Sequence, residues 1–141
     1  MRSAPAPARM FLSMVGIALL AAGCAFREPA PVRELTPAEK GMTPLSGTEV
    51  RSILNKTRYS WQAAQGATGT AITTGDGRVR VMWDTGAVNG RIRFTDTGYC
   101  SRFEGVRNGA EDCYRLYRNG PKGFTVVRQD GTPSGTITLS N

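Results

Sequence analysis

The fold is decided by two short segments, YCSRF at residues 99–103 and DCYRLYR at residues 112–118. Polar and apolar side chains alternate along both, which is the pattern of β-strands with one buried face. If Cys100 faces Cys113 in an antiparallel hairpin, the register of the whole hairpin follows. It pairs Tyr99 with Tyr114, Arg102 with Glu111, and Phe103 with Ala110. Aromatic and opposite-charge pairs both stabilise neighbouring strands, so the sequence predicts this hairpin and its disulfide.

Similar short segments lie on both sides of the hairpin and are separated by turns rich in glycine, asparagine and aspartate. We expect strands at residues 68–73, 78–83, 91–95, 124–128 and 136–139, with an eighth strand at 57–62. Short connections imply that consecutive strands pair antiparallel. The sequence therefore predicts a mainly β domain at residues 45–141, an antiparallel meander of seven or eight strands forming a curved sheet or small barrel.

One short helix precedes these strands. Ser46 and Glu49 have the spacing of a capping box, which satisfies the free N–H groups at the start of a helix. Apolar residues then follow on one face at Val50, Ile53 and Leu54. A helix at residues 47–55 is too short to be stable alone, so we expect it to pack on the apolar face of the sheet.

The N-terminal segment has the features of an export signal. Arg2 and Arg9 precede an uncharged apolar run at residues 10–22, which is shorter than the roughly 20 residues of a membrane-spanning helix. The segment LAAGC at residues 20–24 resembles the lipobox of bacterial lipoproteins. This resemblance implies that residues 1–23 are removed and that Cys24 becomes the lipidated first residue. The alternative is a soluble secreted protein cleaved near Ala22.

Lipidation of Cys24 would also explain the number of cysteines. The chain has three, and using one for the lipid leaves Cys100 and Cys113 as a single disulfide in an oxidising compartment. A zinc site at the same two cysteines is the weaker alternative, because the chain has no histidine to complete it. Residues 24–44 contain several prolines and few apolar residues, which is typical of a tether between an anchor and a domain.

The charge of the chain is concentrated in arginines on the predicted strands. Removal of residues 1–23 lowers the formal net charge from +7 to +5. Strand alternation places six arginines opposite the aromatic and branched side chains: Arg78, Arg80, Arg91, Arg93, Arg102 and Arg115. Guanidinium groups match phosphates and carboxylates, so these residues form a candidate anion-binding face. The alternative is a solvated outer face that Asp84, Glu104 and Glu111 partly neutralise.

No set of residues in the sequence indicates catalysis. Without histidine there is no conventional Ser-His or Cys-His nucleophile pair, and no phosphate-binding glycine motif is present. Glu104 and Glu111 could form a glycosidase pair, but carboxylates beside a disulfide loop are usually just solvated. We therefore expect a protein without enzymatic activity, cofactor or metal. Export argues against nucleic acid as its partner.

Six short segments give the mature chain a family resemblance: LSGTEV at 45–50, NKT at 55–57, NGRIR at 89–93, GYC at 98–100, CY at 113–114 and DG at 130–131. In their order and with the two cysteines, they resemble a family of small exported bacterial proteins known only as a domain of unknown function. The resemblance implies a small antiparallel β domain and carries no assigned activity or catalytic residues.

These observations lead to two functional hypotheses. The first is an envelope lipoprotein that binds an anionic envelope component or a partner protein through the arginine face. The second is a small calyx that carries an apolar molecule between its sheet and its helix. Ala25, and not aspartate, follows Cys24. We therefore expect an anchor in the outer membrane facing the periplasm where the source has one, and otherwise on the outer face of the cell membrane.

Overall fold

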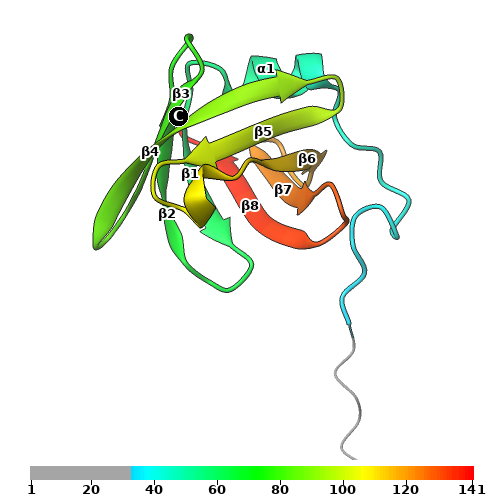
Figure 1. The fold of residues 1–141 in the computed structure, drawn as a ribbon. Coiled ribbons are helices and arrows are strands. Elements are labelled where there is room, and N and C mark those ends of the chain that lie inside the picture. Colours follow the sequence, from blue (N-terminus) through cyan, green and yellow to red (C-terminus); the bar gives the residue numbers. More distant parts are fainter. Residues whose placement is uncertain (1–32) are drawn as a thin grey trace, which may run out of the picture. The chain divides into compact units, whose positions relative to one another are not determined.

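Eight antiparallel strands close into a barrel in the computed structural model, which describes residues 33–141 (Figure 1). The strands are β1 (Arg58–Ala63), β2 (Thr68–Thr73), β3 (Arg78–Trp83), β4 (Gly86–Thr95), β5 (Gly98–Phe103), β6 (Asp112–Arg118), β7 (Gly123–Arg128) and β8 (Pro133–Leu139). Each pairs with the next along the chain, and β1 also pairs with β8. The predicted antiparallel β domain is confirmed, and the sheet is closed. The signal segment and Cys24 lie outside the described residues.

Strand β4 is longer than the sequence predicts. We expected it to begin at Arg91, but it begins at Gly86, and its first part, from Gly86 to Arg91, pairs with β3. Asn89 and Gly90 have the sequence of a turn before this strand, yet both lie inside it. A Cβ atom at Gly90 would come within 2.4 Å of both the Arg102 carbonyl oxygen and the Phe103 ring. Glycine is therefore required by the close approach of β5.

The predicted helix is present as α1 (Gly47–Leu54), and its capping box forms as expected. The Ser46 hydroxyl accepts a hydrogen bond from the Glu49 N–H, and the Glu49 carboxylate accepts one from the Ser46 N–H at 2.8 Å. Val50 and Leu54 are fully buried in the same core as the inward side chains of the barrel.

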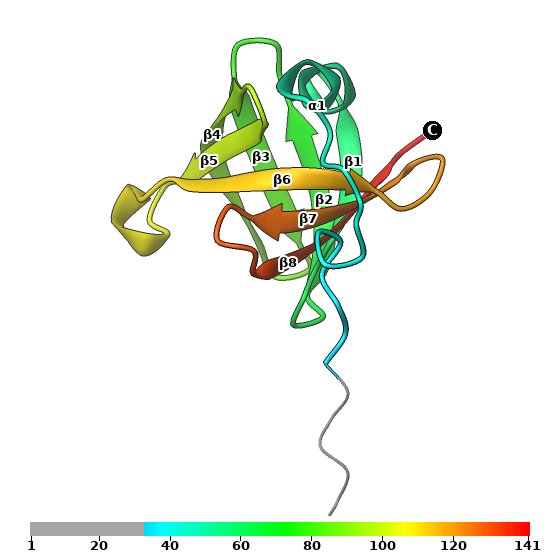
Figure 2. The same cartoon turned by 90° about the vertical axis from the view of Figure 1, so that its right-hand side faces the viewer.

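Helix α1 lies across one end of the barrel (Figure 2). At its start, the Gly47 N–H donates to the Asp96 carbonyl in the β4–β5 turn at 2.8 Å. At its end, the Leu54 carbonyl accepts a hydrogen bond from the Thr73 hydroxyl at the end of β2. The helix is thus attached at two points of the barrel mouth and covers this end of the barrel (Figure 2).

The segment before α1 crosses the outer side of β6 and β7 (Figure 2). It is fixed at its end, where the Leu45 N–H donates to the Leu116 carbonyl at 2.8 Å. Tyr117 and Val127 alternate with the inward residues and point out of the barrel, yet both are buried. Part of the expected tether thus runs along the outer side of β6 and β7, the strands that carry these two side chains (Figure 2).

Candidate functional site: the barrel lumen and the arginine surface

The interior of the barrel contains a partly open cavity of about 210 Å³, which we call the lumen. Residues from all eight strands line it. The inward side chains closest to helix α1 pack against the helix and do not line the cavity. The wall residues include Tyr59, Trp61, Ala71, Tyr99, Ser101 and Tyr114. An eight-stranded barrel has an interior that side chains can just fill or that can hold one small ligand. Here the side chains leave space.

The lumen lies toward the end of the barrel opposite the helix. At the helix end, Leu54, Leu116 and Phe124 are at most 1% exposed and fill the interior. At the other end, the lumen is lined by Ala63 and Phe103, which are the last residues of β1 and β5. The cavity therefore lies among the strands of the barrel, whereas the calyx expected from the sequence lay between a sheet and the helix.

Two aromatic contacts shape the lumen wall. The rings of Tyr99 and Tyr114 stack with centroids 5.2 Å apart, which confirms the cross-strand pair predicted from the cysteines. The indole of Trp61 lies on Gly69, the residue that faces it on β2. A Cβ atom at Gly69 would come within 2.6 Å of the indole Cζ2 atom, so glycine leaves the space that this ring occupies.

The polar groups of the lumen wall are uncharged. Among the described residues, none that lines the lumen is Asp, Glu, Lys or Arg. Burial raises the pKa of Tyr59 to about 12 and raises that of Tyr99 well above 10, because desolvation disfavours the phenolate. Both phenols therefore remain protonated. The Trp61 Nε1–H is buried without a hydrogen-bond acceptor among residues 33–141.

Five of the six predicted arginines share the outer face of three neighbouring strands, β3, β4 and β5. Arg91 is directly opposite Arg78 on one side and Arg102 on the other. Arg78 forms an ion pair with Asp76 at 2.7 Å, whereas Arg91 and Arg102 form none within residues 33–141. Arg115 lies apart from this row, on β6 opposite Val127. The structure thus brings three arginines into register, and within residues 33–141 only Arg78 of the three forms an ion pair.

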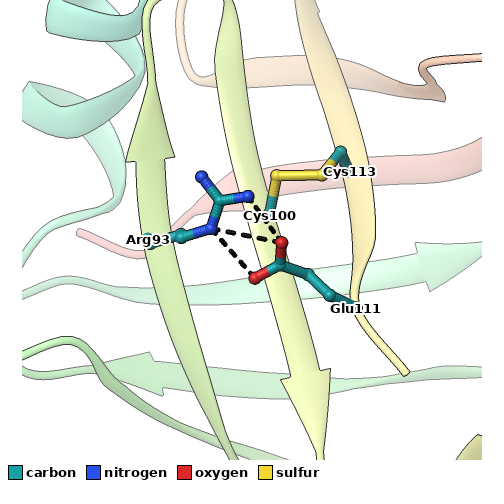
Figure 3. Close-up of a disulfide and its surroundings, with 4 residues drawn as sticks. All are labelled: Arg93, Cys100, Glu111 and Cys113. Carbon is teal, nitrogen blue, oxygen red and sulfur yellow. Dashed lines mark hydrogen bonds and ion pairs between the residues drawn. A yellow bond between two sulfur atoms is a disulfide. The ribbon is translucent and has the colours of Figure 1, made fainter. Parts of the chain in front are cut away.

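The Cys100–Cys113 disulfide joins β5 to β6 on the outer side of the barrel, in the predicted register (Figure 3). The expected pairing of Arg102 with Glu111 is wrong, since Glu111 binds Arg93 of β4. The ladder ends at Ser101 and Asp112, and the chain then turns through a 3-10 helix at Arg107–Gly109. The expected pair of Phe103 and Ala110 is absent for the same reason; Phe103 faces Gly90 instead.

The two disulfide sulfurs and the Glu111 carboxylate lie within 4.8 Å of one another. Because the sulfurs are bonded to each other, this group offers a cation only one carboxylate. No helix among residues 33–141 is long and apolar enough to cross a membrane.

Comparison of the chain with protein-family models, with curated proteins and with solved structures finds no match.

Sequence reasoning identified the arginine surface but not the lumen. Trp61 lines the lumen. Trp83 does not; it is 40% exposed and donates from Nε1 to the Thr85 hydroxyl at 3.0 Å. Alternation shows which side chains point inward. The space left between them depends on the sizes of all the inward residues and on barrel closure.

Proposed function

We propose that the protein is a lipid-anchored envelope protein without enzymatic activity, whose barrel lumen holds one small apolar molecule. The observation that carries the proposal is the cavity of about 210 Å³ within the closed barrel. Protein interiors normally pack at crystal density with few voids larger than a water molecule. The aromatic and branched side chains that line this cavity support the binding of an apolar molecule there.

Ala71 provides a direct test, because its buried side chain points into the lumen from β2. Ala71→Leu adds three carbons there. Thr68→Leu is the matched control, since Thr68 is exposed on the opposite face of the same strand. The full chain is purified from its native envelope and analysed by native mass spectrometry. We expect a co-purifying small molecule in the wild type and in Thr68→Leu, and its loss in Ala71→Leu.

The proposal is overturned if the wild-type protein is empty and takes up no apolar molecule when small aromatic compounds are added. It is also overturned if Ala71→Leu, folded by circular dichroism, retains the bound molecule. Either result would show that the lumen is a packing void.

A second candidate function is anion binding at the outer surface of β3, β4 and β5. The observation that favours it is the direct opposition of Arg91 and Arg102, neither of which has an ion pair within residues 33–141. Like charges opposite each other destabilise a sheet, so their placement favours a role beyond folding. Phosphate-bearing lipid headgroups fit this open surface, because a guanidinium group can donate two parallel hydrogen bonds to one phosphate.

Charge reversal tests this candidate. The lipid anchor alone should give equal binding to neutral phosphatidylcholine vesicles and to anionic phosphatidylglycerol vesicles. We expect the wild type to bind the anionic vesicles more tightly, and we expect Arg91→Glu/Arg102→Glu to abolish this difference. Arg58→Glu is the control, because Arg58 is equally exposed but faces Ile72 on β2. Equal binding of all three proteins to both vesicles would remove the candidate.

A further inference from the structure

Two tyrosines enter the lumen from opposite walls. Strands β1 and β5 are four strands apart in either direction around the closed barrel, so Tyr59 and Tyr99 project inward from opposite sides. Each is the second residue of its strand, and both strands begin at the end of the barrel that helix α1 covers. The two phenols therefore lie on the helix side of the lumen, which we call its floor, whereas Ala63 and Phe103 line the opposite end.

The hydroxyls of these two phenols have no hydrogen-bond partner within residues 33–141. In this part of the chain, one inaccessible side-chain nitrogen or oxygen of a buried or half-buried residue lacks a partner, and it is Nε1 of Trp61. The Tyr59 and Tyr99 hydroxyls therefore keep accessible surface. Because the two residues are only 6% and 8% exposed and both line the lumen, that surface faces the cavity.

The phenols at the floor are neutral and lie near one another. Burial is the main cause of the raised pKa of Tyr99, and repulsion between its phenolate and those of Tyr59 and Tyr114 raises the pKa further. A protonated phenol can donate one hydrogen bond and accept another. No charged side chain of the described chain lines the lumen, so an ion that enters would lose its hydration without gaining a counter-ion.

We infer that the hydroxyls of Tyr59 and Tyr99 hold the polar end of the ligand, which is a neutral, ring-sized molecule with an oxygen atom at one end. The inference deepens the proposed function and rests on it. A hydrocarbon that fills the lumen separates these hydroxyls from water and leaves them unpaired, which is unfavourable. A ligand oxygen at the floor restores their hydrogen bonds, and a few placed polar groups of this kind fix the orientation of a ligand in an apolar pocket.

Volume sets the size of the ligand. A cavity of about 150 Å³ lined by apolar side chains accommodates benzene. The lumen, at about 210 Å³, therefore has room for one substituted ring. The probes p-cresol and p-xylene meet this limit and have nearly the same shape, because they differ only in a hydroxyl that replaces a methyl group.

The test titrates the full chain, reconstituted in nanodiscs, with each probe, using empty nanodiscs to subtract partition into lipid. Occupancy is followed by the indole resonance of Trp61 in nitrogen-15 spectra, because this ring lines the lumen. Trp83, which is 40% exposed and does not line the lumen, is the internal reference. We expect both probes to shift the Trp61 signal of the wild type.

The variants Tyr59→Phe and Tyr99→Phe each remove one hydroxyl and keep the ring. Each should weaken the binding of p-cresol about three- to tenfold, the usual effect of one hydrogen bond, and should not weaken that of p-xylene. The matched control is Tyr117→Phe, which removes the hydroxyl of a buried tyrosine on the outer side of β6 and should affect neither probe. Comparing each probe across the variants separates the hydrogen bond from the greater hydrophobicity of p-xylene.

The inference is overturned if Tyr59→Phe and Tyr99→Phe weaken both probes equally or weaken neither, while the lumen remains a binding site. If neither probe binds to the wild type, the proposed function itself fails. The wild type alone provides a second test if the variants do not fold. The infrared carbonyl stretch of bound acetophenone should lie at a lower frequency than in a hydrocarbon solvent, and an unchanged frequency would overturn the inference.

Discussion

The guanidinium of Arg93 reaches from β4 past β5 to the carboxylate of Glu111, which precedes β6 (Figure 3). Nε lies 3.0 Å from Oε2, and Nη2 lies 2.5 Å from Oε1, so the contact is two-pronged. The pair lies beside the Cys100–Cys113 disulfide, and Cys100 is only 1% exposed. An ion pair and a covalent bond thus connect three consecutive strands at one place on the outer surface.

Glu111 should contribute to stability in a pH-dependent way. Its hydrogen bond to Arg93 lowers its pKa below the ordinary value of 4.5, which means that folding favours the charged form. The contribution is present above pH 4.5 and is lost as the pH falls below that value through the folded pKa. Glu111→Gln should therefore lower the melting temperature near pH 7 and have progressively less effect between pH 4.5 and pH 3.

Glu104→Gln is the control for this prediction, because Glu104 is exposed and forms no ion pair within residues 33–141. Its melting temperature should follow that of the wild type across the same range. An effect of Glu111→Gln that is constant from pH 7 to pH 3 would show that the Arg93 pair does not stabilise the fold.

The disulfide should be the largest single contribution to stability on the outer surface. It joins residues 13 apart in the sequence, and the loss of chain entropy from closing such a loop corresponds to about 3 kcal/mol. Cys100→Ser/Cys113→Ser should lower the free energy of unfolding in urea by about that amount. Reduction of the wild type should have the same effect, and reductant should leave the double variant unchanged. A loss below about 1 kcal/mol would mean that the hairpin is held by its other contacts.

Features encoded by a few neighbouring residues could be predicted from the sequence, whereas features that need the whole chain could not. The capping box of Ser46 and Glu49 and the pair of Tyr99 and Tyr114 each follow from one local spacing. The pairing of β1 with β8 joins the two ends of the sheet, and no local pattern signals it. The partner of Glu111 was misassigned for a related reason: past Ser101 the strands diverge, and Arg93 comes within reach from a third strand.

Gly47 should be intolerant of any side chain. A Cβ atom there would lie 1.6 Å from the Thr95 carbonyl oxygen, which belongs to the backbone of the β4–β5 turn. Gly47→Ala must therefore move the helix away from the barrel end, and overpacking of this kind costs about 1–3 kcal/mol. Thr48→Ala, at the next and exposed position of α1, should change the free energy of unfolding by less than about 0.5 kcal/mol. Equal stabilities of the two variants in urea would contradict the close contact.

Lipidation of Cys24 predicts that the chain incorporates labelled palmitate in its native host. Cys24→Ser should abolish the label, because only the lipobox cysteine is a substrate for the lipid transfer that the resemblance implies. Cys100→Ser/Cys113→Ser should retain it, since those cysteines lie in the barrel. Equal labelling of Cys24→Ser and the wild type would exclude the anchor, and the barrel would then have to be considered as a freely diffusing protein.

Arg91 should destabilise the folded barrel through repulsion from the arginines on the neighbouring strands. It stands directly opposite Arg78 and Arg102, and like charges facing each other on neighbouring strands cost roughly 0.2–1 kcal/mol. Arg91→Gln should therefore raise the free energy of unfolding at low salt, and the gain should shrink near 1 M salt, where the screening length falls to about 3 Å. Arg58→Gln, opposite Ile72, should give no gain. An arginine that lowers the stability of the fold is expected to have a role in binding. If Arg91→Gln leaves the free energy of unfolding unchanged or lowers it, the case for the anion-binding surface is weakened. The proposal of a ligand in the lumen does not depend on this result.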